Sequence, residues 1–450
     1  MLDSAYFRDM FDTASMRAVF SDDTRVTSWL ATETALARAQ ARVGVIPDEA
    51  ADKIEKAARI ENLDLPAMKA EFNQVGFPII PLVHQLQAAC DPEAARWVHW
   101  GATSQDVQDT GMVLQIRDGL TLLEADLNRT IEELARLART HRNTVMAGRS
   151  FQQHAAPITF GYKAAVWLDE MLRHRERLAE LRKRVLVGQF GGAVGTLATL
   201  GGQGLAVRRE LMAELGLAEP KISWHTARDG WAETVFWLGL VTATLGKIAT
   251  EVAILMRSEV NEVREPFEPG RGSSSTMPQK RNPIFCEPVI AIAHRMRECV
   301  GSQLTAMIQE HERGVGAMHL EWIVIPEAFV LISGAFAHMK TMLSGLIIDA
   351  AQMRANLAAG GGFIMAEAVM MGLAPQIGRN HAHKLVQTVA NRAIEQGMTL
   401  RAALLTEPEV TNRLSEAEID VLLEPGNYTG SAGAMVDAVL ARVEAQGDAA

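Results

Sequence analysis

Apolar residues recur at spacings of three and four along most of this chain, and strand-like alternation of apolar and polar residues is scarce. This spacing puts apolar side chains on one face of a helix and therefore predicts a mostly helical protein. Residues 24–43 follow Asp22 and Asp23, which are favourable N-cap residues, and stop at Gly44, a favourable C-terminal cap. The fold class expected from this pattern is all-α.

Three long stretches favour long helices. Residues 104–141 and 229–264 contain no proline, and a third stretch runs from Pro283 to about His311. If each is one helix, 36 residues span roughly 54 Å at about 1.5 Å per residue. This length exceeds that of a typical globular helix and indicates a bundle of long helices.

Residues 235–256 are apolar on nearly every side, and only Lys247 and Glu251 are charged. A membrane span is disfavoured because both charges would lie in its middle. A helix at the centre of a large monomeric core is one alternative. A helix covered by its own bundle and by other subunits is favoured, because one bundle covers only one face.

Glycine-rich segments at 266–278 and 359–362 interrupt the helical pattern. Domain boundaries are expected near residue 102, where short helical stretches give way to the first long one, and near residue 355. The expected domains are an N-terminal helical domain (1–102), a central long-helix bundle that carries the loop 270–283 (103–355) and a small C-terminal helical domain (356–450).

Composition describes a soluble folded protein, with 48% hydrophobic and 22% charged residues among 450. The net charge of −10 argues against nucleic acid as a partner, because phosphate binding needs a basic face. Three widely spaced cysteines (Cys90, Cys286 and Cys299) make neither a disulfide framework nor a zinc site. The first thirteen residues hold three acids and no apolar signal-peptide core. A cytoplasmic protein without membrane association is expected.

The stretch from Gly270 to Pro283, GRGSSSTMPQKRNP, combines three serines with Lys280 and Arg281. A glycine-serine run is often a plain linker. Here Asn282 and the following proline predict a helix start, and a helix N-terminus beside two cations attracts carboxylates. The same surroundings favour the ionised form of serine, which is otherwise a poor base. The loop therefore predicts an anion site with an activated serine.

This loop resembles the signature loop of the fumarase/aspartase superfamily, usually G-S-S-x-M-P-x-K-x-N. Three other segments resemble family segments in the same order: WVHWGATSQDVQDT (97–110), AGRSFQQHAAPITFG (147–161) and QEHERGVGAMHLEW (309–322). The resemblance covers essentially the whole chain. It implies a three-domain helical subunit, a homotetramer with a helix core formed by the long central helices, and active sites shared between subunits.

The chemistry implied by the resemblance removes a proton next to a carboxylate and expels a group from the β-carbon, or adds a nucleophile in reverse. Its costly intermediate is an aci-carboxylate, which needs fixed donors and cations. Ser274 aligns with the loop base, and Ser273 replaces the usual glycine. The resemblance implies catalytic roles for Ser274, His154 and Lys280, and substrate contacts from His99, Thr103, Ser104, Arg149, Gln153, Arg228, Asn282, Glu287 and Arg313.

Some of these residues have structural alternatives. His99 lies between two tryptophans and fits a core histidine bonded to backbone. Glu287 matches a carboxylate that pairs with the family histidine, but a carboxylate in a first helical turn is also favourable by itself. No Walker A sequence and no H-E-x-x-H motif occur, so no metal and no nucleotide cofactor are expected.

Three positions separate branches of the superfamily. Phe151 stands where fumarases, aspartases and adenylosuccinate lyases carry an acid–base histidine, and a phenyl ring transfers no proton; His154 is the nearest alternative acid. Met318 and Trp322 stand at the serine and arginine that hold nucleotide phosphate in adenylosuccinate lyases, and neither can replace those contacts. These departures resemble the branch of the bacterial 3-carboxy-cis,cis-muconate cycloisomerases, as does WHTARD at 224–229.

The resemblance implies a cofactor-free cycloisomerase that closes a small tricarboxylate to a lactone in protocatechuate and aromatic catabolism. The first alternative is a fumarate-releasing C–N lyase that acts on a non-nucleotide N-substituted aspartate. The second alternative is a non-catalytic structural relative, which Ser274, Lys280 and Asn282 argue against because a structural protein does not need them.

Overall fold

The structure is a computed structural model that describes residues 4–267, 272, 276, 277 and 279–447. It divides into two compact units: unit 1 comprises Met1–Leu127, His174–Leu245 and Ala291–Ala337, and unit 2 comprises Asn128–Arg173, Gly246–Ile290 and His338–Ala450. The unit boundaries fall inside the long helices α8 (Ser104–Thr140), α9 (Phe160–Val185), α11 (Asp229–Leu255), α12 (Cys286–Ala306) and α13 (Ala317–Ser344). The all-α expectation is confirmed. The three-domain division stays a prediction beside these two units.

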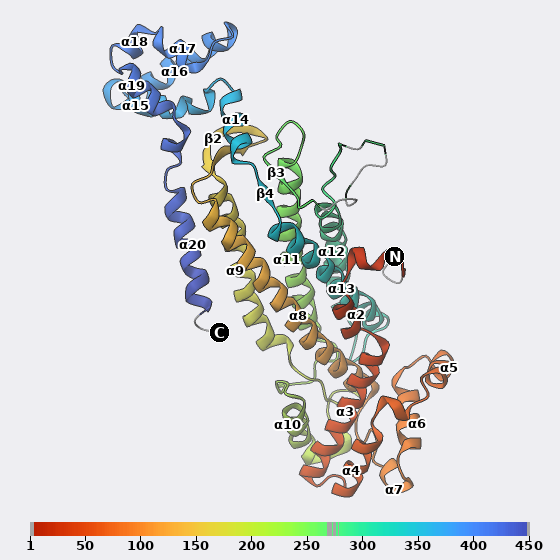
Figure 1. The fold of residues 1–450 in the computed structure, drawn as a ribbon. Coiled ribbons are helices and arrows are strands. Elements are labelled where there is room, and N and C mark those ends of the chain that lie inside the picture. Colours follow the sequence, from red (N-terminus) through yellow and green to blue (C-terminus); the bar gives the residue numbers. More distant parts are fainter. Residues whose placement is uncertain (1–3, 268–271, 273–275, 278, 448–450) are drawn as a thin grey trace. The chain divides into compact units, whose positions relative to one another are not determined.

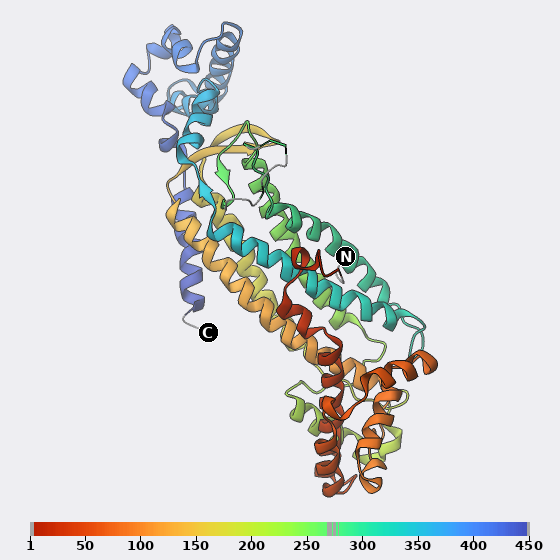
Figure 2. The ribbon, with the colours of Figure 1, turned by 45° about the vertical axis from the view of Figure 1, so that its right-hand side comes forward.

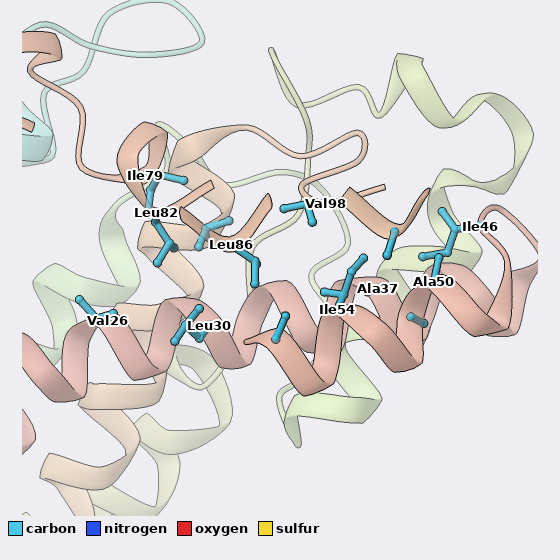
Figure 3. Close-up of a cluster of buried hydrophobic side chains, with 14 of the residues drawn as sticks. Val26, Leu30, Ala37, Ile46, Ala50, Ile54, Ile79, Leu82, Leu86 and Val98 are labelled. Atoms are coloured by element: carbon cyan, nitrogen blue, oxygen red, sulfur yellow. The ribbon is translucent and has the colours of Figure 1, made fainter. Parts of the chain in front are cut away.

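Besides its segments of the long helices, unit 1 contains several shorter helices. They are α1 (Arg8–Phe11), α2 (Ala14–Val19), α3 (Asp22–Val43), α4 (Asp48–Ala57), α5 (Leu65–Val75), α6 (Ile79–Ala89), α7 (Pro92–Ala95) and α10 (Gly204–Leu215), with 3-10 turns at Ile60–Asn62 and Ala198–Gln203. Helix α3 packs against α4 and α10. Figure 3 shows the apolar cluster packed against α3, in which Leu30, Ile54 and Leu82 are almost fully buried.

The ends of α3 explain one correct and one wrong prediction. Gly44 ends the helix with a left-handed backbone (φ 77°), as expected for a glycine cap. The N-cap, however, is Ser21, whose hydroxyl accepts a hydrogen bond from the backbone N–H of Thr24. Asp22 and Asp23 lie in the first turn instead, where carboxylates stabilise the helix dipole.

Unit 2 holds the described strands and the C-terminal helices. The strands are β1 (Val145–Ser150), β2 (Gln153–Thr159), β3 (Val263–Arg264) and β4 (Ile347–Ile348), and the helices are α14 (Ala350–Ala359), α15 (Ala366–Ile377), α16 (Arg379–Glu395), α17 (Leu400–Leu405), α18 (Pro408–Thr411), α19 (Glu416–Leu423) and α20 (Ala432–Gly447), with 3-10 turns at Phe363–Met365 and Pro425–Tyr428. The antiparallel β1–β2 hairpin lies beside α14 (Figure 2). Helices α15 to α19 lie together in Figure 1. Their buried apolar side chains form a cluster of their own.

The long stretches form helices, but two are shorter than expected. The prediction for 104–141 is confirmed by α8. The stretch 229–264 is helical only to Leu255, because Val263 and Arg264 pair with Ile347 and Ile348 as a two-stranded sheet. Helix α12 begins at Cys286 rather than at Pro283 and ends at Ala306. Strand pairing and capping by distant residues decide these ends.

The two charges within the apolar stretch of α11, Lys247 and Glu251, form ion pairs within the chain. In unit 2, Lys247 lies 2.5 Å from Glu170, and Glu251 lies 2.5 Å from Lys163, with both partners on α9. By length and composition alone, α11 and α13 could each cross a membrane. Both helices also leave large side chains exposed on this single chain, with Phe236 50% and Ile323 64% exposed. In the predicted oligomer, other subunits would cover these faces.

Candidate active site

In unit 1, the predicted carboxylate contacts lie on the segment that enters α8. His99 has a left-handed backbone (φ 61°), which is costly for a residue with a side chain and occurs often at functional sites. Its Nδ1 lies 2.5 Å from Oε1 of Glu33 on α3, and the glutamate side chain is 1% exposed. The structural alternative, a core histidine bonded to backbone, is therefore wrong, because the partner of His99 is a buried carboxylate, and the predicted substrate contact stays a prediction.

The Glu33 carboxylate controls the protonation of His99. Burial lowers the pKa of His99, but the charge and hydrogen bond of Glu33 outweigh burial and raise the pKa above its ordinary value. A raised folded-state pKa means that the pair stabilises the protein fully below the ordinary histidine pKa, and that this stabilisation is lost as the pH rises through the folded value.

Replacing Glu33 with glutamine is expected to lower the pKa of His99 and to cost about 1.5–3 kcal/mol of unfolding free energy at pH 6, because a charged hydrogen bond is lost. The cost should be smaller at pH 9 than at pH 6, because a rise in pH through the folded-state pKa removes the charge of His99. NMR titration of the His99 ring protons and urea unfolding at both pH values measure these effects. An equal stability loss at pH 6 and pH 9 would show that the pair is not charged.

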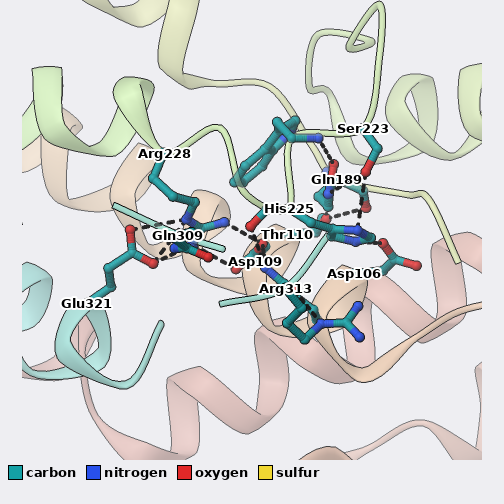
Figure 4. Close-up of polar contacts among 12 residues, drawn as sticks. Asp106, Asp109, Thr110, Gln189, Ser223, His225, Arg228, Gln309, Arg313 and Glu321 are labelled. Carbon is teal, nitrogen blue, oxygen red and sulfur yellow. Dashed lines mark hydrogen bonds and ion pairs between the residues drawn. The ribbon is translucent and has the colours of Figure 1, made fainter. Parts of the chain in front are cut away.

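Asp106 organises the start of α8. Its buried carboxylate accepts hydrogen bonds from the backbone N–H groups of Thr103 (3.1 Å), Gly191 (2.9 Å) and Gly192 (2.9 Å). Nε2 of His225 lies 2.8 Å from the same carboxylate (Figure 4). Asp106 thereby ties the backbone at Thr103, beside the predicted carboxylate-binding hydroxyls, to the backbone at Gly191 and Gly192.

Arg228 lies at the centre of a buried ion-pair cluster. Its guanidinium donates to Asp109 (2.6 and 3.1 Å) and to Glu321 (2.7 to 3.1 Å), and the arginine is 2% exposed. The guanidinium carbon also lies 3.9 Å from the ring centre of Trp231. Burial opposes the charge of Arg228, yet the two carboxylates raise its pKa above the ordinary arginine value. The role predicted for Arg228 is corrected here: its buried guanidinium pairs with two carboxylates of the protein, so it is a structural cation.

Gln105 connects this cluster to Arg313. Its amide Nε2 donates to Asp109 (3.1 Å) and to the carbonyl of His225 (2.9 Å), and its Oε1 accepts from Nε of Arg313 (2.7 Å). Nη2 of Arg313 also donates to the carbonyl of Ala193 (3.2 Å). These two bonds hold Arg313 through the Nε and Nη2 atoms of its guanidinium, and the residue is exposed. An exposed guanidinium held in this way suits a carboxylate ligand.

In unit 2, Arg149 and the turn after β1 shape the second predicted segment. Arg149 donates two hydrogen bonds to the buried Glu262 (3.0 and 2.6 Å), and Asn356 binds the same carboxylate. The two-residue turn, Phe151 and Gln152, has positive φ at both positions (50° and 66°), which glycine or asparagine usually occupies. Phe151 is 99% exposed at this strained turn.

His154 and Gln153 begin β2 on the same hairpin, and His154 pairs in register with Arg149. Burial, and then the charge of Arg149, lowers the pKa of His154, while Glu262 opposes this effect. His154 is therefore mostly neutral near pH 7, where it can accept a proton but rarely holds one to donate. Its predicted role as a general acid fits poorly with this charge state.

Ser274 lies outside the described residues, so its predicted role stays a prediction. Lys280 is exposed, and the backbone N–H of Asn282 donates to the carbonyl of Gly272 (3.4 Å). The predicted helix start at Asn282 and Pro283 is wrong. The carboxylate of Glu265 accepts hydrogen bonds from the N–H groups of Phe285 and Cys286 (2.8 to 3.2 Å), so the protein itself fills this helix N-terminus.

Glu287 lies in the first turn of α12, as expected, and is exposed. Arg281 stacks on Phe267, with its guanidinium carbon 4.0 Å from the ring centre. Within each unit the structure therefore groups the predicted residues. Unit 1 joins Thr103 and Arg313 through the hydrogen bonds of α8, and unit 2 places Arg149 and His154 on one hairpin.

Sequence reasoning missed the residues that position these side chains. Asp106 and Asp109 lie inside the segment 97–110, which resembles a family segment. Two carboxylates in an otherwise largely buried helix could have indicated buried polar partners. Glu262 and Glu265 carry no such signal, because their partners lie far away in sequence. The described part of the chain contains no group of three or more acidic, histidine or cysteine residues that could hold a metal ion.

The chain matches known lyases along nearly its whole length. Residues 9–297 match the family described as Lyase, and residues 362–439 match the region described as adenylosuccinate lyase C-terminus. A 3-carboxy-cis,cis-muconate cycloisomerase of Pseudomonas aeruginosa is 49% identical over 444 residues, which cover 98% of this chain and 97% of that protein. An N-acetyl-S-(2-succino)cysteine lyase of Enterococcus italicus is 38% identical and covers 99% of this chain and 98% of that protein.

A solved structure is also similar to this chain along nearly its whole length. The crystal structure of the 3-carboxy-cis,cis-muconate lactonizing enzyme from Pseudomonas putida has a TM-score of 0.92 and 42% sequence identity, and it covers 98% of this chain and 99% of that one. Both the sequence motifs and the arrangement of helices therefore agree with one assignment: the chain belongs to the lyase family within the fumarase/aspartase superfamily.

Proposed function

We propose that the protein is a cofactor-independent cycloisomerase that converts 3-carboxy-cis,cis-muconate to a carboxy-muconolactone in aromatic catabolism. Phe151 carries the proposal. Its exposed ring occupies the position at which related C–N and C–O lyases use a histidine for acid–base chemistry. A lactonisation expels no amine or alcohol, so it needs no acid for a leaving group. The names of the P. aeruginosa and P. putida relatives support the same activity.

The proposed reaction conserves every atom of the substrate. A carboxylate oxygen forms a bond to one carbon of a double bond in the same molecule, and the π electrons move to the neighbouring carbon. The carboxyl group next to that carbon holds the charge as an aci-carboxylate, which fixed cations and hydroxyls stabilise. The carbon then takes a proton, which we assign to the Ser274 hydroxyl, and solvent water returns a proton to the serine oxygen.

The binding roles follow from which groups remain available. Arg313 and Lys280 are exposed cations, and Thr103 and Ser104 lie on a segment that Asp106 holds in place. We assign the carboxylates of the substrate to these residues and to Asn282. Arg149 and Arg228 already bind buried carboxylates of the protein and act as positioning residues in this scheme.

Nucleotide substrates fit this chain poorly. Met318 is buried, and Trp322 lies one turn further along α13, at the positions where adenylosuccinate lyases hold phosphate. A thioether and an indole give phosphate no cation and no bidentate donor. We therefore do not assign adenylosuccinate as a substrate.

A substrate comparison tests the proposal. Purified protein is given 3-carboxy-cis,cis-muconate, adenylosuccinate and N-substituted aspartates, and the loss of muconate absorbance and the formation of fumarate are followed. We expect lactonisation with a kcat/KM at least about 100-fold above that for the other two. Turnover of adenylosuccinate would overturn the interpretation of Met318 and Trp322.

A lyase that releases fumarate is the second candidate, because the E. italicus relative is named for cleavage of a succinyl adduct. Fumarate from an aspartate adduct, or from an S-succinyl thiol included as a further substrate, would select this candidate if no lactone forms. The assay thus separates both enzyme classes from a non-catalytic relative, which would turn over none of these compounds.

We also propose that the chain forms a homotetramer in the cytoplasm. The exposed apolar residues on α11 and α13 support association, because large apolar patches are rarely left in water. The three cysteines are free, which suits a reducing compartment. Light scattering should give a mass about four times the 49.1-kDa chain. A monodisperse monomer would contradict the tetramer.

A further inference from the structure

Gln105 is a buried glutamine that contacts both the ion-pair cluster around Arg228 and the exposed Arg313, all within unit 1. It lies in the first turn of α8, directly after the predicted carboxylate contacts Thr103 and Ser104, and it is 2% exposed. Burying a side-chain amide costs free energy unless its polar atoms are hydrogen-bonded. The hydrogen bonds of Gln105 therefore indicate what this residue does.

The amide of Gln105 fits its surroundings in one orientation. Its Nε2 donates to Asp109 (3.1 Å) and to the carbonyl oxygen of His225 (2.9 Å), so both amide hydrogens have acceptors. Turning the amide over would place Oε1 against these two acceptors and would bring Nε2 to the Nε–H donor of Arg313. The buried groups therefore fix Oε1 as an acceptor that faces Arg313.

Two hydrogen bonds use one edge of the Arg313 guanidinium. Nε donates to Oε1 of Gln105 (2.7 Å), and Nη2 donates to the carbonyl oxygen of Ala193 (3.2 Å). Nε and Nη2 form the side edge of a guanidinium, so the end edge between Nη1 and Nη2 keeps two donors. Among the described residues, none accepts a hydrogen bond from Nη1 of Arg313. In Arg228, the same end edge binds the carboxylate of Asp109.

We propose that Gln105 is a positioning residue that turns the end edge of Arg313 toward a carboxylate of the substrate. Without Oε1 of Gln105, the long Arg313 side chain would be held less firmly and would lose more conformational freedom when a carboxylate binds. The inference rests on the proposed function, in which Arg313 receives a substrate carboxylate. It deepens that function by connecting the buried carboxylate of Asp109 to the substrate through Gln105.

Steady-state kinetics of Gln105→Met test the proposal. Methionine has a similar length but no amide, so the variant loses the hydrogen bond to Arg313. We expect KM for 3-carboxy-cis,cis-muconate to rise roughly 5- to 30-fold, as the loss of one hydrogen bond to a charged group predicts. The kcat should change less than about threefold, because a contact made equally in the ground and transition states affects KM alone. An unchanged KM would overturn the proposal.

Gln303→Met is the matched control. Gln303 is also buried, at 1% exposure, and its Nε2 donates to Glu321 of the same ion-pair cluster (3.1 Å), but it makes no hydrogen bond to Arg313. Urea unfolding should show similar stability losses for Gln303→Met and Gln105→Met, whereas KM should rise only in Gln105→Met. An equal rise of KM in both variants would show that disturbance of the cluster is sufficient, and would overturn the proposal.

A double-mutant cycle separates positioning from a purely structural effect. If Gln105 acts through Arg313, adding Gln105→Met to Arg313→Met should change kcat/KM by less than about twofold, because the group that Gln105 positions is already absent. The full additional loss would overturn the proposal. Gln105→Asn keeps an amide in the buried site but shortens its reach toward Arg313, so it should raise KM as well and replaces Gln105→Met if that variant does not fold.

Calorimetry with tricarballylate, a saturated tricarboxylate, measures carboxylate binding without turnover. Its dissociation constant should rise roughly 5- to 30-fold in Gln105→Met and stay unchanged in Gln303→Met. A protein that binds tricarballylate in this pattern but does not lactonise muconate would contradict the proposed function and support the positioning role. Equal tricarballylate affinity in Gln105→Met and the natural protein would overturn the positioning role, whatever the lactonisation assay shows.

Discussion

Replacing Arg228 with methionine is expected to lower the free energy of unfolding by about 3–5 kcal/mol, because it leaves two buried carboxylates without a cation. Asp109 and Glu321 face Arg228 directly, and both are about 1% exposed or less. Burial already raises the pKa of Glu321 even though Arg228 opposes this effect. Without the guanidinium, both carboxylates would have to take up protons or draw water into the core.

Urea unfolding followed by circular dichroism measures the loss. The difference in unfolding free energy between the variant and the natural protein should shrink as the pH falls, because protonation neutralises the unpaired carboxylates of the variant. Combining Arg228→Met with Asp109→Asn and Glu321→Gln should recover most of the lost stability. Arg401→Met is the matched control, since its ion pairs with Glu416 and Asp420 lie at the surface and should matter little. Similar losses for Arg228→Met and Arg401→Met would refute a structural role for the buried cluster.

Ser274→Ala is expected to reduce kcat about 10²- to 10⁴-fold with little change in KM, because it removes the proposed proton-transfer group and leaves the carboxylate contacts in place. Steady-state kinetics on 3-carboxy-cis,cis-muconate measure both constants. Ser273→Gly is the matched control: it restores the glycine usual in the family loop and should keep most of the turnover. Near-normal kcat in Ser274→Ala would remove this serine from the mechanism.

Helix existence was readable from the sequence because it depends on local spacing. The absence of proline and the three- and four-residue periodicity predicted a helix over 104–141, and α8 runs from Ser104 to Thr140, one residue shorter. Gly44 marked the end of α3 for the same local reason. Helix ends that depend on other segments were predicted wrongly. The side chain of Glu265 caps the start of α12, and Val263 and Arg264, which were expected to extend α11, pair with β4 instead.

The family and the chemical class were also readable from local motifs, because a loop that binds carboxylates needs particular residue types at fixed spacing. The sequence by itself therefore determined that this is a helical lyase-family protein, while the anion-binding role of its loop stays a prediction. Only the tertiary structure decided which arginines are available to a substrate. Arg228 and Arg313 look alike in sequence, but long-range packing gives Arg228 two buried carboxylates and leaves Arg313 exposed, because burial and ion pairing depend on residues more than 90 positions away.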